Sequence, residues 1–341
     1  PKEIGSVKAE AVDEAAKALA VSTTVGFAFY PDDGPTLYQL MKAADLALIS
    51  AKSLSRDSVV AYSRSMSDSF RKKAWEIQGI RDAITHKEIE PYYQPLVNAH
   101  TLKLEGVETL VRWNHPELGT LRPNSFESAL ADPAVAVAVT ETMLDLLLKD
   151  LKTWWACGHR FFASLNVGEF DLRHPGLSDM IYEKLSQNEL PPSALTIEVT
   201  ESAVNGANVH AVLPILQSFR DRGFSVALDD FGTGTSSLTL LRMLPRTAIK
   251  IDKSFVADIV QDPEDHAIVQ SLTQLGRDLN IKVVAEGVET DEQVELLRSL
   301  GVDVFQGFLF GKPQTSADIS RNLQLGQVAP LNGAQSVSYT H

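Results

Sequence analysis

The stretch SVALDDFGTGTSSL, residues 225–238, decides the fold and the chemistry that we predict for this chain. An apolar run typical of a buried strand leads into two adjacent aspartates, Asp229 and Asp230. Consecutive strand residues point to opposite faces, so both carboxylates can face one site only if the strand ends at this pair. Gly232 and Gly234 follow at once and permit the bend that such an ending needs. We therefore predict two carboxylates at the end of a strand.

Apolar strand patterns alternate with helical patterns on both sides of this stretch. Repeated strand–helix units favour a parallel sheet, and eight strands over about 230 residues fit a TIM (β/α)8 barrel. Only NAHT separates the first two strands, and a parallel crossover needs a longer connection. The fold class that we predict is α/β, a modified TIM barrel with one antiparallel strand. The expected strands are PYYQPLVN, LEGVETLVRW, FFASLN, LTIEVT, FSVALD, AIKI, KVVAE and DVFQ.

A smaller α/β piece precedes the barrel. Helical patterns at AEAVDEAAKALA and LYQLMKAADLALISAK alternate there with strand patterns at TTVGFAFY and SVVAYS. The charged helical pattern SDSFRKKAWEIQGIRDAITH then leads into the barrel, and the chain ends in a polar stretch without periodicity. The regions that we expect are the α/β piece at 1–65, a linker helix at 66–87, the barrel at 88–314 and a tail at 315–341.

The composition argues against several function classes. The chain has 31 basic and 44 acidic residues, a net charge of −13, so we expect no DNA- or RNA-binding surface. The single cysteine, Cys157, cannot form an internal disulfide, which favours a reducing compartment. No run approaches the roughly 20 apolar residues of a membrane span. We expect a cytoplasmic location. Because the sequence starts at Pro1 rather than Met, we also expect that any membrane anchor lies in segments outside this chain.

Polar side chains gather at the carboxyl ends of the predicted strands, which meet at one face of a barrel. Burying many carboxylates without a cation is costly, and Lys250 alone cannot balance them. Oxygen ligands without histidine or cysteine favour Mg²⁺ or Mn²⁺ over zinc. Two ions sharing a carboxylate are the usual arrangement for phosphoryl displacement, so we predict two per site. The strand-end residues are Glu108, Arg112, Asn166, Glu198, Glu201, Asp229, Asp230, Lys250, Asp252, Glu286, Glu289 and Gln306.

Eight motifs occur in order over residues 70–314: YYQP, VETLVRWNHPELG, LN, IEVTES, LDDFGTGTSSL, IKIDKSFV, VVAEGVET and QGFLFGKP. Together they resemble the EAL-domain family of cyclic di-GMP phosphodiesterases. The resemblance implies hydrolysis of one phosphodiester bond of cyclic di-GMP to linear pGpG. It also implies a modified barrel with one antiparallel strand, in agreement with the short NAHT connection.

The resemblance assigns roles to individual residues. Lys250 matches the residue that holds the catalytic water, with Gln306 beside it and Glu286 also in the catalytic set. Glu201 matches a residue that steadies the loop after the paired aspartates. Substrate binding falls to Gln94, Arg112 and Asp230. The metal ligands would be Glu108, Asn166, Glu198 and Asp229 for one ion and Asp229, Asp230 and Glu286 for the other.

The sequence departs from the family pattern at a few positions. Thr109 stands where the family usually has alanine, and Thr235 replaces an aromatic residue after the glycines. The segment SFESALADPAVAVAV, residues 125–139, lacks the family's usual FIPLAEETG pattern. Residues 1–65 resemble the C-terminal part of a GGDEF (diguanylate cyclase) domain, but the GGDEF signature is absent, so we expect no cyclase activity.

Two alternatives to an active phosphodiesterase remain open at this point. A catalytically weak EAL-type domain could serve as a cyclic di-GMP receptor that signals to partner proteins. A different barrel enzyme could use Lys250 as a Schiff-base nucleophile. Such a lysine needs a lowered pKa, however, and a ring of carboxylates would raise it. The family also dimerises through the face near the DDFGTG loop, so we expect a homodimer.

Overall fold

The computed structural model describes residues 23–54, 57–174, 176–232 and 237–326. The chain divides into two compact units, Pro1–Trp75 and Glu76–His341. The division falls within one continuous helix, α2 (Arg64–His86).

The first unit contains a βαβ arrangement. Strands β1 (Val25–Phe27) and β2 (Val59–Ala61) pair in parallel, and helix α1 (Leu37–Leu54) connects them. These elements confirm the two strand patterns and the second helical pattern of the N-terminal piece. The first helical pattern, residues 9–20, lies outside the described residues.

The second unit contains a barrel in which one strand runs against its neighbours. Strand β3 is antiparallel to both β4 and β11, the remaining barrel strands pair in parallel, and the β3–β4 pairing closes the sheet. The short connection therefore has the predicted effect, and the modified TIM barrel is confirmed. Bounds of the barrel strands are β3 Ile89–Asn98, β4 Leu104–His115, β6 Phe162–Asn166, β7 Leu195–Thr200, β8 Ser225–Phe231, β9 Ala248–Ile251, β10 Lys282–Ala285 and β11 Val304–Gln306.

One strand was not expected. Strand β5 (Gly119–Leu121) pairs antiparallel with the end of β4 through a turn at His115–Gly119. At 12 residues, β4 is longer than the parallel strands: Gly106–Thr109 pair with β6, and Trp113–His115 pair with β5. Its three-residue partner carries too little pattern to be read from sequence.

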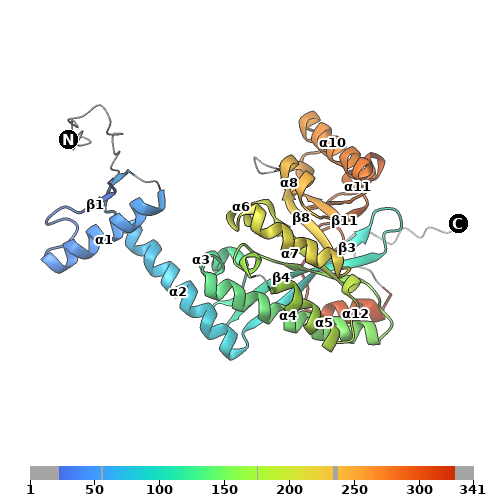
Figure 1. The fold of residues 1–341 in the computed structure, drawn as a ribbon, viewed down its shortest axis with the longest axis horizontal. Coiled ribbons are helices and arrows are strands. Elements are labelled where there is room, and N and C mark those ends of the chain that lie inside the picture. The colour runs from blue at the N-terminus through green and yellow to red at the C-terminus, as the bar shows by residue number, and fades with distance from the viewer. Residues whose placement is uncertain (1–22, 55–56, 175, 233–236, 327–341) are drawn as a thin grey trace, which may run out of the picture. The chain divides into compact units, whose positions relative to one another are not determined.

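Helices surround the barrel, with α4 beside α5 and α10 beside α11 (Figure 1). Their ends follow ordinary capping chemistry: Asp132 accepts a hydrogen bond from the Val135 N–H at the start of α4, and Thr290 and Gln293 form a capping box on α11. None of the helices in the described ranges is long and apolar enough to span a bilayer. The helices are α3 Glu127–Leu130, α4 Pro133–Ala156, α5 Leu177–Gln187, α6 Glu201–Gly206, α7 Val209–Asp221, α8 Ser237–Met243, α9 Lys253–Ala257, α10 Pro263–Leu279, α11 Asp291–Leu300 and α12 Ser316–Gln324, with short 3₁₀ turns η1 Pro123–Ser125, η2 Asp171–Arg173 and η3 Pro192–Ala194.

The unit has two apolar regions of different size. The main core lies between the sheet and the helices. A second, much smaller cluster consists of Leu96, Val284 and Val304 with Phe162 packed against them. These four side chains come from β3, β10, β11 and β6 and form an apolar layer inside the barrel. Polar side chains fill the interior beyond this layer.

Candidate active site

A buried lysine surrounded by carboxylates lies in the barrel interior. The side chain of Lys250, on β9, is only 1% exposed. Its Nζ lies 2.6 Å from Glu286 Oε1, and the other three carboxylates come from β4, β7 and β8. One ammonium group therefore faces four acidic groups from four separate segments. The remaining distances are 3.1 Å to Glu198, 3.2 Å to Asp229 and 3.5 Å to Glu108.

The carboxylates form two overlapping groups that share Asp229. Glu108, Glu198 and Asp229 make the first, and Asp229, Asp230 and Glu286 make the second. Within each group, one oxygen from each residue lies within 4.8 Å of the others. We call these five residues, with Lys250, the carboxylate cluster. Its shape allows two cations to share one aspartate.

The backbone at the paired aspartates differs from the sequence prediction. Strand β8 does not end at the pair but continues to Phe231, with an irregular register against β9 between Leu228 and Phe231. Asp230 adopts a left-handed conformation, with φ of 52°, and its N–H donates to Asp229 Oδ1. A bulge of this kind re-aims a side chain without ending the strand. The bend is therefore within the strand, and Gly232, with φ of 100°, continues it; Gly234 and Thr235 lie outside the described residues.

Burial controls the protonation of the cluster. Burial raises the pKa of Glu198 and of Glu286 to about 8 each, even though Lys250 opposes the shift. Burial would also raise the pKa of Glu108, but Lys250 and the side chains of Gln306 and Asn166 outweigh it and hold the pKa below its ordinary value. Without a further cation, burial therefore favours the protonated forms of Glu198 and Glu286.

The same surroundings keep Lys250 charged. Burial alone would lower the pKa of this lysine. The nearby carboxylates outweigh burial and hold the pKa of Lys250 well above its ordinary value. A lysine in this state is a poor amine nucleophile, which argues against Schiff-base chemistry as the sequence reasoning expected.

Amide side chains extend the carboxylate cluster around Glu108. The Nδ2 of Asn166 donates to Glu108 Oε1 at 3.1 Å, and the Nε2 of Gln306 donates to Glu108 Oε2. Gln306 also donates to Gln94 Oε1 at 3.3 Å, and Gln94 donates to the Gly311 carbonyl. The Oε1 of Gln306 is buried and has no hydrogen-bond partner among the described residues. Asn166, Gln306 and Gln94 are thus in one network with Glu108.

Two of the predicted site residues are placed differently. Arg112 lies four residues beyond Glu108 on β4, where its guanidinium packs over the Tyr92 ring and its Nη1 donates to the Val111 carbonyl. Glu201 is buried at the start of α6, directly after the N-cap residue Thr200. Neither belongs to the two carboxylate groups. Asp252 is among the strand-end residues noted in the sequence. Its side chain caps α9 by accepting a hydrogen bond from the Ser254 N–H.

A pocket of about 310 Å³ adjoins the carboxylate cluster. Sequence reasoning missed it, together with Asp171, whose buried carboxylate accepts from Thr140 Oγ1 and from the Gly168 N–H at 2.9 Å each. Burial raises the pKa of Asp171. The only sequence signal was an aspartate soon after Asn166. We call this the β4–α4 pocket; its lining includes Thr109, Leu130, Val139, Thr140, Asn166 and Glu198.

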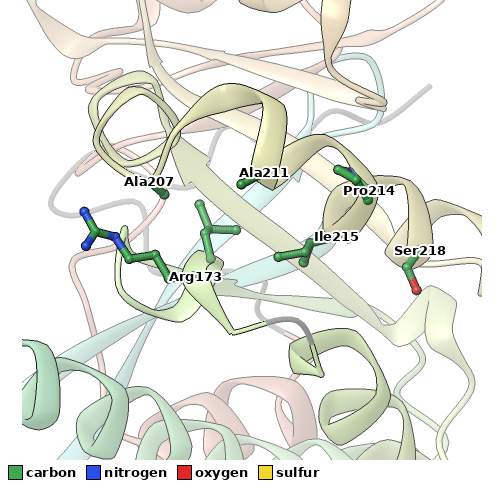
Figure 2. A pocket seen from close by; sticks show the side chains of 7 residues that line it. Arg173, Ala207, Ala211, Pro214, Ile215 and Ser218 are labelled. Atoms are coloured by element: carbon green, nitrogen blue, oxygen red, sulfur yellow. The ribbon is translucent and has the colours of Figure 1, made fainter.

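A second pocket of about 310 Å³ lies elsewhere, between η2 and α7. Figure 2 shows small and apolar side chains around it, including Ala211 and Ile215, with the Arg173 side chain on one side. The Arg173 guanidinium pairs with Glu169 and packs over the Phe170 ring. The lining contains none of the predicted site residues. This pocket is therefore separate from the carboxylate cluster.

The donor chemistry of the cluster fits divalent magnesium or manganese. The available ligand atoms are carboxylate oxygens, as hard divalent cations prefer, and the Asn166 side-chain amide lies against Glu108. The cluster also carries more negative than positive charge, and the oxygen of the neighbouring Gln306, without a partner among the described residues, can accept a hydrogen bond from water. We conclude that the residues present suit a two-cation site.

Comparison with known proteins identifies the family of the chain. Residues 77–313 match the family model of the EAL domain. The chain belongs to the EAL-domain family. The bifunctional diguanylate cyclase/cyclic di-GMP phosphodiesterase MucR of Pseudomonas aeruginosa is 36% identical over 302 residues, covering 88% of this chain and 44% of MucR. Cyclic di-GMP phosphodiesterase NbdA of the same organism is 33% identical over 309 residues, covering 90% of this chain and 39% of NbdA.

A solved structure of the same EAL-domain family supports the fold. The structure named PaMucR Phosphodiesterase, c-di-GMP complex is 37% identical, with a TM-score of 0.68, and covers 72% of this chain and 99% of that one. The chain spans less than half the length of the two curated relatives. Both relatives carry phosphodiesterase names, so the family relation supports a phosphodiesterase.

Proposed function

We propose that the chain is a metal-dependent phosphodiesterase that hydrolyses cyclic di-GMP to linear pGpG. The observation that carries this proposal is the pair of carboxylate groups sharing Asp229 around a buried, charged Lys250. Two cations that share a ligand suit in-line displacement at a phosphodiester. Relatives named for cyclic di-GMP hydrolysis supply the choice of substrate.

Each group of ligands would hold one ion. Glu108, Asn166, Glu198 and Asp229 would hold the first, and Asp229, Asp230 and Glu286 the second. Bound Mg²⁺ or Mn²⁺ would neutralise the carboxylates, lower the pKa of a bound water and polarise the phosphodiester. The Gln306 side-chain oxygen, which has no partner among the described residues, and the Lys250 ammonium would orient that water.

The remaining proposed roles concern the substrate and the loop. Arg112 is a fixed positive charge because Tyr92 and the Val111 carbonyl hold its guanidinium in place, and it would bind the dianionic substrate. Gln94, in hydrogen-bond contact with Gln306, would bind the substrate beside it. Glu201, buried at the start of α6, would position the loop that follows the paired aspartates.

Turnover of cyclic di-GMP tests the proposal directly. The protein should convert cyclic di-GMP to pGpG with added Mg²⁺ or Mn²⁺, measured by separation of the nucleotides, and should stop when EDTA is added. Restored activity on return of the metal completes the expected result. Cyclic di-GMP binding without product at any metal concentration would instead identify a receptor module. Neither binding nor turnover would exclude both functions.

We also propose that the first unit is the C-terminal part of a GGDEF domain. The alignment with MucR runs over 302 residues, more than the stretch from residue 77 to residue 341 contains, so it extends into this unit. MucR is named as a bifunctional diguanylate cyclase. No diguanylate cyclase activity is expected from this chain, because the GGDEF signature is absent from the sequence. Incubation with GTP and Mg²⁺ should yield no cyclic di-GMP.

A further inference from the structure

The β4–α4 pocket contains a polar atom that the proposed site leaves unused. Thr109, on β4, is 3% exposed and lines the pocket, and its Oγ1 has no hydrogen-bond partner among the described residues. An unsatisfied buried hydroxyl costs free energy, so native structures rarely keep one without a reason. A ligand group that pairs with this hydroxyl would supply the reason.

A second threonine in the same pocket provides the contrast. Thr140, on α4, also lines the pocket, but its Oγ1 donates to Asp171 Oδ2 at 2.9 Å. Asp171 in turn accepts the Gly168 N–H. The hydroxyl of Thr140 is therefore committed to the fold. Of these two pocket threonines, Thr109 is the one whose hydroxyl remains available.

The pocket has the size and character of a site for a small organic group. Its volume of about 310 Å³ is at the lower end for small-molecule sites. Leu130, Val139 and Met143 give it apolar walls. It shares Glu198 with the carboxylate cluster and is also lined by Asn166, whose Nδ2 donates to Glu108, so a group entering the pocket would be attached close to the scissile phosphate.

We propose that Thr109 is a specificity-determining residue, whose hydroxyl hydrogen bonds the edge of one substrate nucleobase held in the β4–α4 pocket. The inference rests on the proposed function, because cyclic di-GMP carries a guanine next to each phosphodiester. Thr109 follows the cluster residue Glu108 directly on β4 and points to the opposite face of the strand. The base contact is therefore separate from the metal ligands. Alanine, the usual residue of the family at this position, could not make it.

The Thr109→Val variant tests this role because it replaces the hydroxyl with a methyl group of similar size. We expect KM for cyclic di-GMP to rise roughly two- to tenfold, the range of one neutral hydrogen bond, with kcat unchanged. Hydrolysis of bis(p-nitrophenyl) phosphate, a phosphodiester without a base, should be unaffected. Thr109→Ser keeps the hydroxyl and should keep KM near that of the wild type.

Stability separates a ligand contact from a structural one. Thr109→Val removes an unpaired polar atom, so its melting temperature without ligand should equal or exceed that of the wild type. Thr140→Val, the matched control, leaves the Asp171 carboxylate without one partner and should melt at a lower temperature. A Thr109→Val variant that melts lower would overturn the inference.

The kinetic outcomes also distinguish this inference from the proposed function. An unchanged KM for cyclic di-GMP in Thr109→Val, or an equal loss on both substrates, would overturn the role of Thr109 while leaving the phosphodiesterase intact. A wild-type protein that cleaves bis(p-nitrophenyl) phosphate but not cyclic di-GMP would overturn the proposed substrate, and the base contact with it. A wild-type protein that cleaves neither with Mg²⁺ or Mn²⁺ would overturn both.

Discussion

Two layers of the same barrel interior differ completely in chemistry. The lower layer holds Leu96, Phe162, Val284 and Val304 in an apolar cluster. The upper layer lies two residues further toward the carboxyl end of the barrel. It holds charged and amide side chains around Lys250. In three of the strands the change occurs over two residues, from Leu96 to Gln94 on the reversed β3, from Val284 to Glu286 after β10 and from Val304 to Gln306 on β11.

The contrast between the two layers separates the residues that stabilise the barrel from the residues that we expect to carry its chemistry. Apolar side chains in the lower layer stabilise the barrel by leaving water. The upper layer carries buried carboxylates with raised pKa values, which is unfavourable unless a cation is bound. We infer that the lower layer serves stability and the upper layer serves chemistry. The following predictions test that division, from the largest expected effect to the smallest.

The shared ligand should show the largest effect. Asp229→Asn removes a negative charge that belongs to both carboxylate groups, so kcat for cyclic di-GMP should fall by about 10³-fold or more, the scale of losing charge stabilisation at a reacting phosphate. Glu105→Gln is the matched control, because Glu105 lies on β4 three residues before Glu108 and pairs with Lys282. Normal turnover by Asp229→Asn would show that Asp229 does not bridge two ions.

Removal of the Lys250 ammonium group should lower the stability of the fold as well as the activity. Lys250→Met leaves four largely buried carboxylates, 3–17% exposed, without their ammonium partner, so the metal-free variant should lose about 3–5 kcal/mol of unfolding free energy. Urea denaturation in EDTA measures this loss. Lys282→Met, at a lysine whose side chain is 59% exposed, should cost under about 1 kcal/mol. Equal losses in the two variants would contradict a special role for the upper layer.

Metal binding should stabilise the native state through the upper layer. At 100 times the dissociation constant, a ligand specific for the native state adds about 2.7 kcal/mol, so Mn²⁺ should raise the melting temperature measured by calorimetry. The shift should disappear with EDTA. It should also be smaller in Asp229→Asn than in Glu105→Gln, since only the former removes a proposed ligand. An identical shift in both variants would place the stabilising ion elsewhere.

A change in the lower layer should affect stability alone. Val304→Ala removes two buried methyl groups, so the free energy of unfolding should fall by about 2 kcal/mol. The KM and kcat for cyclic di-GMP should stay within about twofold of the wild-type values at a temperature where the variant is folded. A large fall in kcat would show that the two layers are coupled through β11.

Much of the fold was predictable because the alternation of strands and helices is visible in the sequence as a local pattern of apolar residues. All eight barrel strands were expected from their apolar runs, and the length of NAHT was sufficient to predict the antiparallel strand. Strand β5 was missed because three residues carry no usable periodicity. The path of β8 through the aspartates was also wrong in the prediction, because a bulge leaves no regular mark in the sequence.

The amino-acid sequence by itself determined which polar side chains stand at strand ends, and therefore that Glu108, Glu198, Asp229 and Glu286 could converge, because parallel strands end at one face. Only the tertiary structure decided that Lys250 lies between all four, and that Thr109 faces a pocket with its hydroxyl unpaired within the described part of the chain. Distances between side chains from different strands depend on barrel closure, register and twist. These are properties of the whole sheet, which no single segment of sequence encodes.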